Sequence, residues 1–348
     1  MSSAIVSRKM PEKSPFSLIR RDNWRQWLYP AVLLVIYTSW TSYMMIADRW
    51  SLFTEYWPMS LTMVLGSMVA GATAEGGAAV AFPVFTKAFQ IPAPDARTFG
   101  LMIQSVGMTT ASLVILTRRV KILPGVIAWV SLGGVLGMTV GTFFLPMTAP
   151  YPKILFTFVT VAFGVALIIS RWILNWNPES VFPVQTTKRR MLCILIGIFG
   201  GIFAANTGSG IDTLTFMVLT LTFGIHEKIS TPSTVIIMGI NSVVGFFLHG
   251  VVLQDIGVVW NYWLVCIPIV ILGAPFGAWI ASRVNRDIII LILLALISVE
   301  LVTTIWIIPF TPEMIRFAGI TVLVCILWFA VMLLYRYRRL RLQGNARP

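Results

Sequence analysis

Long apolar runs separated by short polar segments dominate the sequence. A helix needs about 20 apolar residues to cross the roughly 30 Å hydrocarbon core of a bilayer. Runs of this length predict an all-α polytopic membrane protein with about eight spans, at residues 28–47, 98–117, 122–146, 152–171, 232–252, 258–282, 288–308 and 314–335. Two more apolar stretches, residues 58–90 and 191–223, are each interrupted near the middle.

The interruption in the second of these stretches reads GGIFAANTGSGID, residues 200–212, and contains residues that break helices. In the first stretch, the arm after the break covers residues 78–90, which form a helix of only about 20 Å at 1.5 Å per residue. This arm is too short to cross the hydrocarbon core, which disfavours a pair of full spans. Both stretches are therefore predicted to be re-entrant broken-helix hairpins that turn back inside the membrane.

The distribution of positive charge supports this topology. If both hairpins return to the face they started from, most of the 26 Lys and Arg residues fall on one face together with both termini. The other face then carries only Arg49, Lys87, Arg97, Lys153 and Arg316. By the positive-inside rule, both termini are predicted to be cytoplasmic. The net charge of +13 thus reflects topology and does not indicate a nucleic-acid partner. With 57% hydrophobic and 11% charged residues, a soluble domain is excluded.

The two halves resemble each other at an offset of about 134 residues. Each has a small-residue break followed by an apolar arm, and later a Gly-x3-Gly pair, Gly137 with Gly141 and Gly273 with Gly277, which favours close helix packing. We predict a single transmembrane domain (28–335) with repeats at 58–171 and 191–308, flanking helices at 28–47 and 314–335, and basic tails at 1–27 and 336–348. An odd number of crossings separates the repeats, so they are inverted, which is typical of secondary transporters.

Irregular backbone at membrane depth is tolerated only where it is buried in protein or lines a cavity, so the breaks mark a candidate site. The helix that follows each break points its free N–H groups into the membrane centre, which favours an anion. Glu75, Asp212 and Glu300 are candidate proton carriers, although Glu300 is equally well explained as a protonated side chain with a hydrogen bond to a neighbouring helix. The predicted substrate-binding residues are Glu75, Gly76, Gly77, Gln104, Asn206, Thr207, Gly208, Ser209, Gly210 and Asn241.

The paired breaks, together with SVVGFFLHGVVLQDIGVVWNYWLVCIPIVILGAPFGAWIASRV at residues 242–284, resemble the TauE/SafE sulfite exporter family, also called toluene-sulfonate uptake permeases. The resemblance implies a transporter of sulfite, a sulfonate or a related organic anion in the bacterial inner membrane. The chain departs from the family at the first break, where Glu75 interrupts the expected glycine-rich run, and an acid, Asp212, follows the second break. An ionised carboxylate there would repel an anion.

Other functions remain as alternatives to a carrier: an anion channel, a non-transporting membrane subunit and an intramembrane enzyme. The chain has no HExxH, GxSxG or Walker motif, which argues against catalysis and ATP hydrolysis. Cys193, Cys266 and Cys325 lack CxxC spacing and indicate packing, so neither a metal nor a cofactor is predicted. The expected partners are a small anion and the lipid bilayer, and the sequence leaves open whether the protein forms a homo-oligomer.

Overall fold

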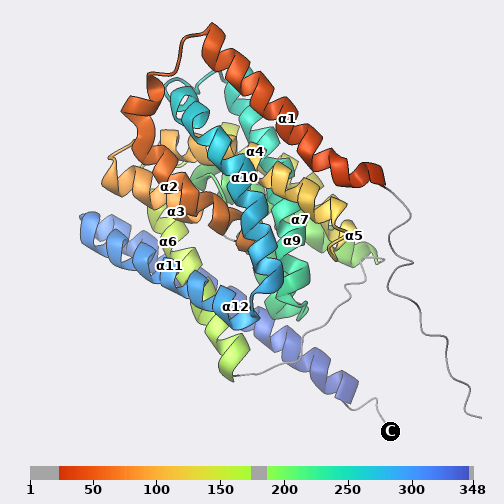
Figure 1. Ribbon diagram of the computed structural model, residues 1–348. Helices are drawn as coiled ribbons and strands as arrows, with labels where there is room; N and C mark the ends of the chain where they lie inside the picture. The colour runs from red at the N-terminus through yellow and green to blue at the C-terminus, as the bar shows by residue number, and fades with distance from the viewer. Residues whose placement is uncertain (1–22, 75, 174–185, 345–348) are drawn as a thin grey trace, which may run out of the picture.

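The computed structural model describes residues 23–74, 76–173 and 186–344, and every regular element in these ranges is a helix. α1 (Asn23–Ile46) precedes two halves with the same order of elements. The first half contains α2 (Leu52–Ala72), α3 (Ala78–Pro83) with the π-helical turn η2 (Val84–Ala88), α4 (Ala93–Thr117), α5 (Pro124–Phe143), and α6 (Tyr151–Ile168) with η3 (Ile169–Ile173). The second contains α7 (Thr187–Thr207), α8 (Ile211–Met217) with η4 (Val218–Thr222), α9 (Glu227–Phe247) with η5 (Leu248–Val252), α10 (Val259–Arg283) and α11 (Arg286–Ile307). α12 (Pro312–Gly344) ends the described chain, and α1 and α12 lie at opposite edges of the molecule (Figure 1).

Eight of the described helices are long and apolar enough to cross a membrane, which confirms the polytopic all-α fold. They are not the predicted eight, because they include α7 and leave out α1. With 21 residues, α7 is about 30 Å long, so its length does not require it to turn back inside the membrane. Both chain breaks are present, and the re-entrant course of the two hairpins stays a prediction.

Several helices extend beyond the predicted apolar runs. α4 begins at Ala93 and α9 at Glu227, whereas the predicted spans begin at residues 98 and 232. α12 continues to Gly344, so much of the predicted basic tail is helical. The prediction ended each span at its first charged residues, but a helix can continue past the apolar core as long as its backbone hydrogen bonds are made. Residues 1–22 of the predicted N-terminal tail lie outside the described chain.

The two halves exchange packing partners. α2 of the first half packs against α10 of the second, while α7 of the second half packs against α5 of the first. α4 and α9, at corresponding positions, pack against each other. Glycine allows these close approaches, because a Cβ at Gly137 would overlap the carbonyl oxygen of Ile198, and a Cβ at Gly277 that of Met68. The close packing predicted from the two glycine pairs is confirmed.

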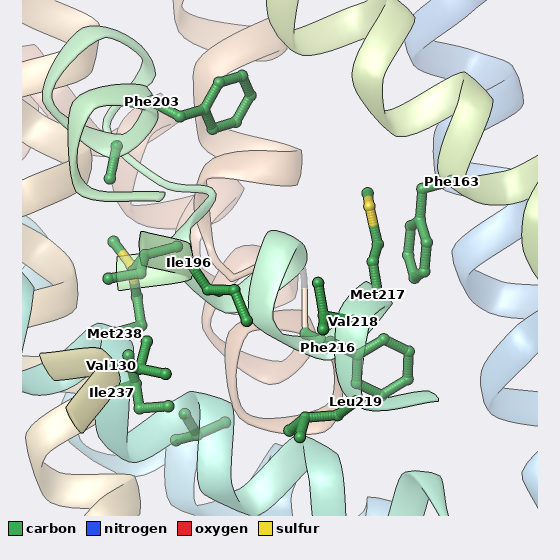
Figure 2. Close-up of a cluster of buried hydrophobic side chains, with 14 of the residues drawn as sticks. Val130, Phe163, Ile196, Phe203, Phe216, Met217, Val218, Leu219, Ile237 and Met238 are labelled. Carbon is green, nitrogen blue, oxygen red and sulfur yellow. The ribbon is translucent and has the colours of Figure 1, made fainter. Parts of the chain in front are cut away.

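The short helix after each break is embedded in protein. Phe216, Met217 and Leu219 of α8 and η4 lie in a buried cluster, where the Phe216 ring meets Phe163 of α6 edge-on at a centroid distance of 5.7 Å (Figure 2). In the first half, the Phe85 ring of η2 packs on Phe99 of α4 at 4.5 Å. These contacts shield the interrupted backbone from lipid, as a break at membrane depth requires.

Candidate functional site at the two chain breaks

Each break is shaped by glycines in conformations that other residues rarely adopt. Gly76 has a φ of +69°, Gly208 of +82° and Gly210 of +126°. Left-handed backbone of this kind is accessible to glycine without steric cost. α3 and α8 begin directly after the breaks, as the sequence predicts. Glu75 lies outside the described residues.

The two breaks meet each other in space. A Cβ placed on Gly76 of the first break would lie 2.7 Å from Oε1 of Gln104, 3.0 Å from Oδ2 of Asp212 and 3.1 Å from Oγ of Ser209. A direct hydrogen bond also joins them, since the Thr213 hydroxyl at the start of α8 donates to the carbonyl of Ala74 at 2.9 Å. The structure therefore brings together Gly76, Gln104, Ser209 and Asp212 from both halves of the chain.

Gln104 holds the second break against α4. Its Nε2 donates to the carbonyl oxygens of Gly208, at 2.9 Å, and of Gly100, one turn earlier on the same helix, at 3.1 Å. Gly100 itself faces the break, since a Cβ there would lie 3.2 Å from the Gly208 oxygen. The sequence prediction included Gln104 but missed Gly100. The Gly-x3-Gln spacing, which puts both residues on one helix face, is the signal that would have found it.

Asp212 caps the start of α8 from inside the protein. Its Oδ1 accepts hydrogen bonds from the backbone N–H groups of Gly210 and Thr213, both at 3.0 Å. A carboxylate at this end of a helix is favoured by the helix dipole. The side chain is completely buried, and neither its Oδ2 nor Oε1 of Gln104 has a hydrogen-bond partner within the described part of the chain. Two buried acceptors beside Gly76 thus lack a donor.

Arg97 of α4 contacts the second break with its backbone. The Arg97 backbone packs on Gly208, where a Cβ would lie 3.1 Å from the Arg97 Cα. Its guanidinium interacts electrostatically with Asp95 and Asp255, and Nε has no hydrogen-bond partner among the described residues. Asp255 also lies 2.9 Å from Nδ1 of His249, a buried side chain in η5. Arg97 therefore contacts the break through its backbone, while its guanidinium belongs to a cluster with two carboxylates and His249.

Other predicted binding residues use their polar atoms for local hydrogen bonds. Asn206 donates to the carbonyl of Leu145 at 3.1 Å and accepts from the N–H of Met147 at 2.7 Å, so it fixes the segment after α5. The Thr207 hydroxyl donates to the carbonyl of Ser209 at 2.6 Å, within the break itself. These bonds give both side chains a structural role.

Two more predicted residues lie beside the breaks but face other helices. Gly77 faces α2, where a Cβ would lie 3.5 Å from the Ala70 side chain. Asn241 of α9, the counterpart of Gln104 in the second half, donates to its own helix at the carbonyl of Ile237 at 2.8 Å. Its Oδ1 packs against Gly134 of α5 and has no hydrogen-bond partner among the described residues. The structure does not bring Asn241 into contact with Gly76.

Glu300 lies in a separate polar cluster. Its Oε2 is 2.9 Å from Nζ of Lys87, at the end of the first hairpin, and its Oε1 accepts from the Thr157 hydroxyl at 2.8 Å. Lys87 also donates to the hydroxyls of Thr303 and Thr304, both at 2.8 Å. The sequence prediction counted Lys87 among the charges at one membrane face, and its side chain is buried. Of the two explanations considered for Glu300, the hydrogen bond to a neighbouring helix agrees with the Thr157 contact, but its other oxygen pairs with a cation, which the prediction did not include. Its part in proton coupling stays a prediction.

Among the described residues, no group of three His, Cys, Asp or Glu side chains could hold a metal ion. Cys193 and Cys266 are buried and free, and Cys325 is partly buried.

The family profile of the sulfite exporter TauE/SafE matches residues 59–304, more than half of the chain. The chain belongs to the TauE/SafE family. The match runs from α2 into α11, so it covers both breaks and both halves. TauE/SafE proteins are transporters of sulfite and sulfonates, and the polytopic fold agrees with this class. No curated protein and no solved structure matches the chain.

Proposed function

We propose that this TauE/SafE protein is a proton-coupled secondary transporter of a small anion, which is sulfite, a sulfonate or a related organic anion. It works by alternating access around the two chain breaks. The observation that carries the proposal is the contact between the breaks at Gly76, Gln104 and Asp212, because residues from both halves then share one site. We place the protein in the bacterial inner membrane, with both termini cytoplasmic and no catalytic activity.

Attraction of the anion is supported by three features. The starts of α3 and α8 direct backbone N–H groups toward the breaks, where glycine gives an oxyanion close access to the backbone. At α8, the N–H groups of Gly210 and Thr213 are shared with the Asp212 carboxylate. Arg97, whose backbone packs on Gly208, contributes a positive charge from α4. The Ser209 side chain, which is completely buried, supplies a hydroxyl close to Gly76. A sulfonate or sulfite group has three oxygens and suits several donors of this kind.

Proton coupling follows from the charge of Asp212. An ionised carboxylate beside the site repels an anion, whereas a protonated one can donate from Oδ2 to Oε1 of Gln104 or to a substrate oxygen. The proton supplies the donor that these two buried oxygens lack. The anion therefore binds together with a proton, which makes the protein a symporter whose net flux follows the sum of the two gradients.

The test is uptake of radiolabelled sulfite, sulfoacetate or an aryl sulfonate into vesicles that contain the purified protein. An acid-outside gradient of about one pH unit should drive on the order of tenfold accumulation of a singly charged anion, because each tenfold concentration ratio equals about 1.4 kcal/mol. Uptake should be saturable. Non-saturable flux through an open pathway would assign a channel instead, and an absence of flux for all of these anions would end the proposal.

The variant Asp212→Asn separates coupling from transport. Asn keeps an oxygen that can accept from the Gly210 and Thr213 N–H groups, but it cannot bind and release a proton. The substrate concentration inside the vesicles should therefore rise only to that outside, while downhill exchange continues. The matched control is Asp287→Asn at the start of α11, where the carboxylate is about half exposed and lies on another helix. The control should accumulate substrate like the unaltered protein. Accumulation by Asp212→Asn would remove this residue from the coupling mechanism.

A further inference from the structure

An apolar groove runs between α7 and α12. α12 packs mainly on α6 and η4, and two cavities of about 580 and 680 Å³ lie between it and α7. Both cavities share Phe199 of α7 and Val324 and Trp328 of α12 as walls, so they form one continuous groove. In a bilayer such a space does not fill with water, because its walls are almost entirely apolar.

The depth of the outer cavity matches one leaflet of a membrane. Along α7 it reaches from Lys188 to Phe199, about 16 Å at 1.5 Å per residue. Half of a hydrocarbon core of roughly 30 Å is about 15 Å. On the opposite wall, α12 contributes residues from Tyr335 to Val324 over a similar length. An acyl chain entering from the face of Lys188 therefore ends near Phe199, where the second cavity begins.

Charge is confined to one end of the groove. Lys188 and Arg189 line the outer cavity where α7 begins, whereas the described residues that line the inner cavity include no charged side chain. The next cation, Arg190, instead lies over the ring of Trp129, with its guanidinium 5.5 Å from the ring centroid. Basic pockets between membrane helices suit anionic headgroups. This groove thus has the polarity of a phospholipid, with cations at the interface and hydrocarbon below.

We propose that the groove binds an anionic phospholipid, with an acyl chain between α7 and α12 and the phosphate beside Lys188 and Arg189. The second hairpin forms one wall of the same groove, through Val218 and Thr222 in the outer cavity and Leu214 in the inner one. A bound acyl chain therefore packs directly on the arm that carries Asp212 at its start.

The test uses Trp328, which lies in both cavities, as a fluorescent reporter. The protein is reconstituted in phosphatidylcholine vesicles with a minor fraction of brominated phosphatidylglycerol or brominated phosphatidylcholine, since bromine quenches a tryptophan it touches. Subtracting the signal of the Trp328→Phe variant isolates this residue. A basic side chain near the surface enriches an anionic lipid on the order of fivefold. Brominated phosphatidylglycerol should thus quench Trp328 at a mole fraction at least about fivefold lower than brominated phosphatidylcholine.

Matched controls separate the groove from the general lipid surface. Trp306 of α11 is 85% exposed and does not line the groove, so its component, isolated with Trp306→Phe, should be quenched equally by both lipids. The double variant Lys188→Gln with Arg189→Gln should lose the preference at Trp328 and leave Trp306 unchanged. Arg338→Gln, which removes an exposed cation at the same end of α12, should keep the preference.

Three results would overturn the proposal. Equal quenching of Trp328 by both lipids would reduce the groove to a hydrocarbon slot without headgroup selection. A lack of quenching by either lipid would mean that protein, such as a second copy of the chain, fills it. A phosphatidylglycerol preference that survives in the Lys188 and Arg189 variant would place the headgroup elsewhere. All of these readouts are independent of anion transport, so they do not depend on the proposed function.

Discussion

Lys87 and Glu300 form a buried ion pair, with side chains that are 5% and 4% exposed, respectively. Removing two charges from water is costly, and the pair is tolerated because their attraction and the surrounding threonine hydroxyls compensate. Thr157 and Thr304 both donate to Oε1 of Glu300, at 2.8 and 3.1 Å. Loss of one partner therefore leaves an uncompensated buried charge, which is far more costly than loss of both.

Glu300→Gln should lower the free energy of unfolding by about 3–5 kcal/mol, because it leaves the Lys87 ammonium buried without its counter-charge. The double variant Lys87→Met with Glu300→Gln should recover most of that loss. Denaturant unfolding in detergent micelles measures both. The matched control is Asp287→Asn, which breaks the partly exposed Arg171–Asp287 pair, with N to O at 2.7 Å, and should cost about 0–1 kcal/mol. Similar losses for the two single variants would contradict this account.

At the residue scale, the sequence predicted the breaks well and the polar partners less well. Glycine in a left-handed conformation leaves a clear signal, so Gly76, Gly208 and Gly210 were identified, and the sequence also indicated Gln104. For Lys87, the sequence indicates a position in the apolar arm at residues 78–90 but no partner. Its partner lies 213 residues away, and no local pattern shows that the end of an arm will pack on α11.

The helices cross each other closely at positions that carry small residues. Where α2 crosses α10, Gly71 of α2 faces the Ala274 carbonyl, while Gly273 and Gly277 of α10 face Ser67 and Met68. The crossing of α5 and α7 uses glycines in the same way. Without a hydrophobic driving force between helices in lipid, close van der Waals contact of this kind provides much of the association energy.

Gly277→Ala tests this packing. Alanine is the better helix former by about 1 kcal/mol, so the substitution would stabilise a helix in open surroundings. Here the added methyl group overlaps the Met68 carbonyl, and overpacking of this kind costs about 1–3 kcal/mol. The thermal midpoint in detergent should therefore fall. In the control, Gly319→Ala on α12, no atom lies within 4 Å of the new methyl group, and the midpoint should stay or rise. A higher midpoint for Gly277→Ala would contradict tight packing.

At the scale of whole elements, small residues in the sequence indicate that another helix packs closely on a given helix, but they do not indicate which helix it is. The glycine pairs of α5 and α10 were therefore predicted as packing surfaces, while their partners α7 and α2 were not. Helix ends were also placed too far inside the apolar runs, because hydropathy reports the boundary of the lipid rather than that of the backbone hydrogen bonds.

At the scale of the whole molecule, the orientation of the segments follows from where the hairpins emerge. If both hairpins are re-entrant, the residues just before and just after each one lie on the same face of the membrane. If either runs straight across, they lie on opposite faces. The exposed ends of the hairpins allow a direct measurement, once the three native cysteines are replaced by alanine.

In this cysteine-free protein, single substitutions to cysteine are made at four exposed positions. Asp48→Cys and Pro94→Cys flank the first hairpin, and Thr186→Cys and Lys228→Cys flank the second. We expect a membrane-impermeant maleimide to label the cysteines at positions 48 and 94 from one face of the membrane, and those at positions 186 and 228 from the other. Arg118, also exposed, should be labelled from the face of Thr186. Labelling of Asp48 and Pro94 from opposite faces would show that the first segment spans the membrane.

The exchange of packing partners between the halves has a consequence for biosynthesis. α2 leaves the ribosome early, but α10, which covers its small-residue surface, is made almost two hundred residues later. For α5 this delay is much shorter, because its partner α7 follows it more closely in the sequence. A newly inserted N-terminal half therefore keeps one uncovered seam facing lipid until the C-terminal half is complete, and a chain released before α10 has nothing of its own to close it.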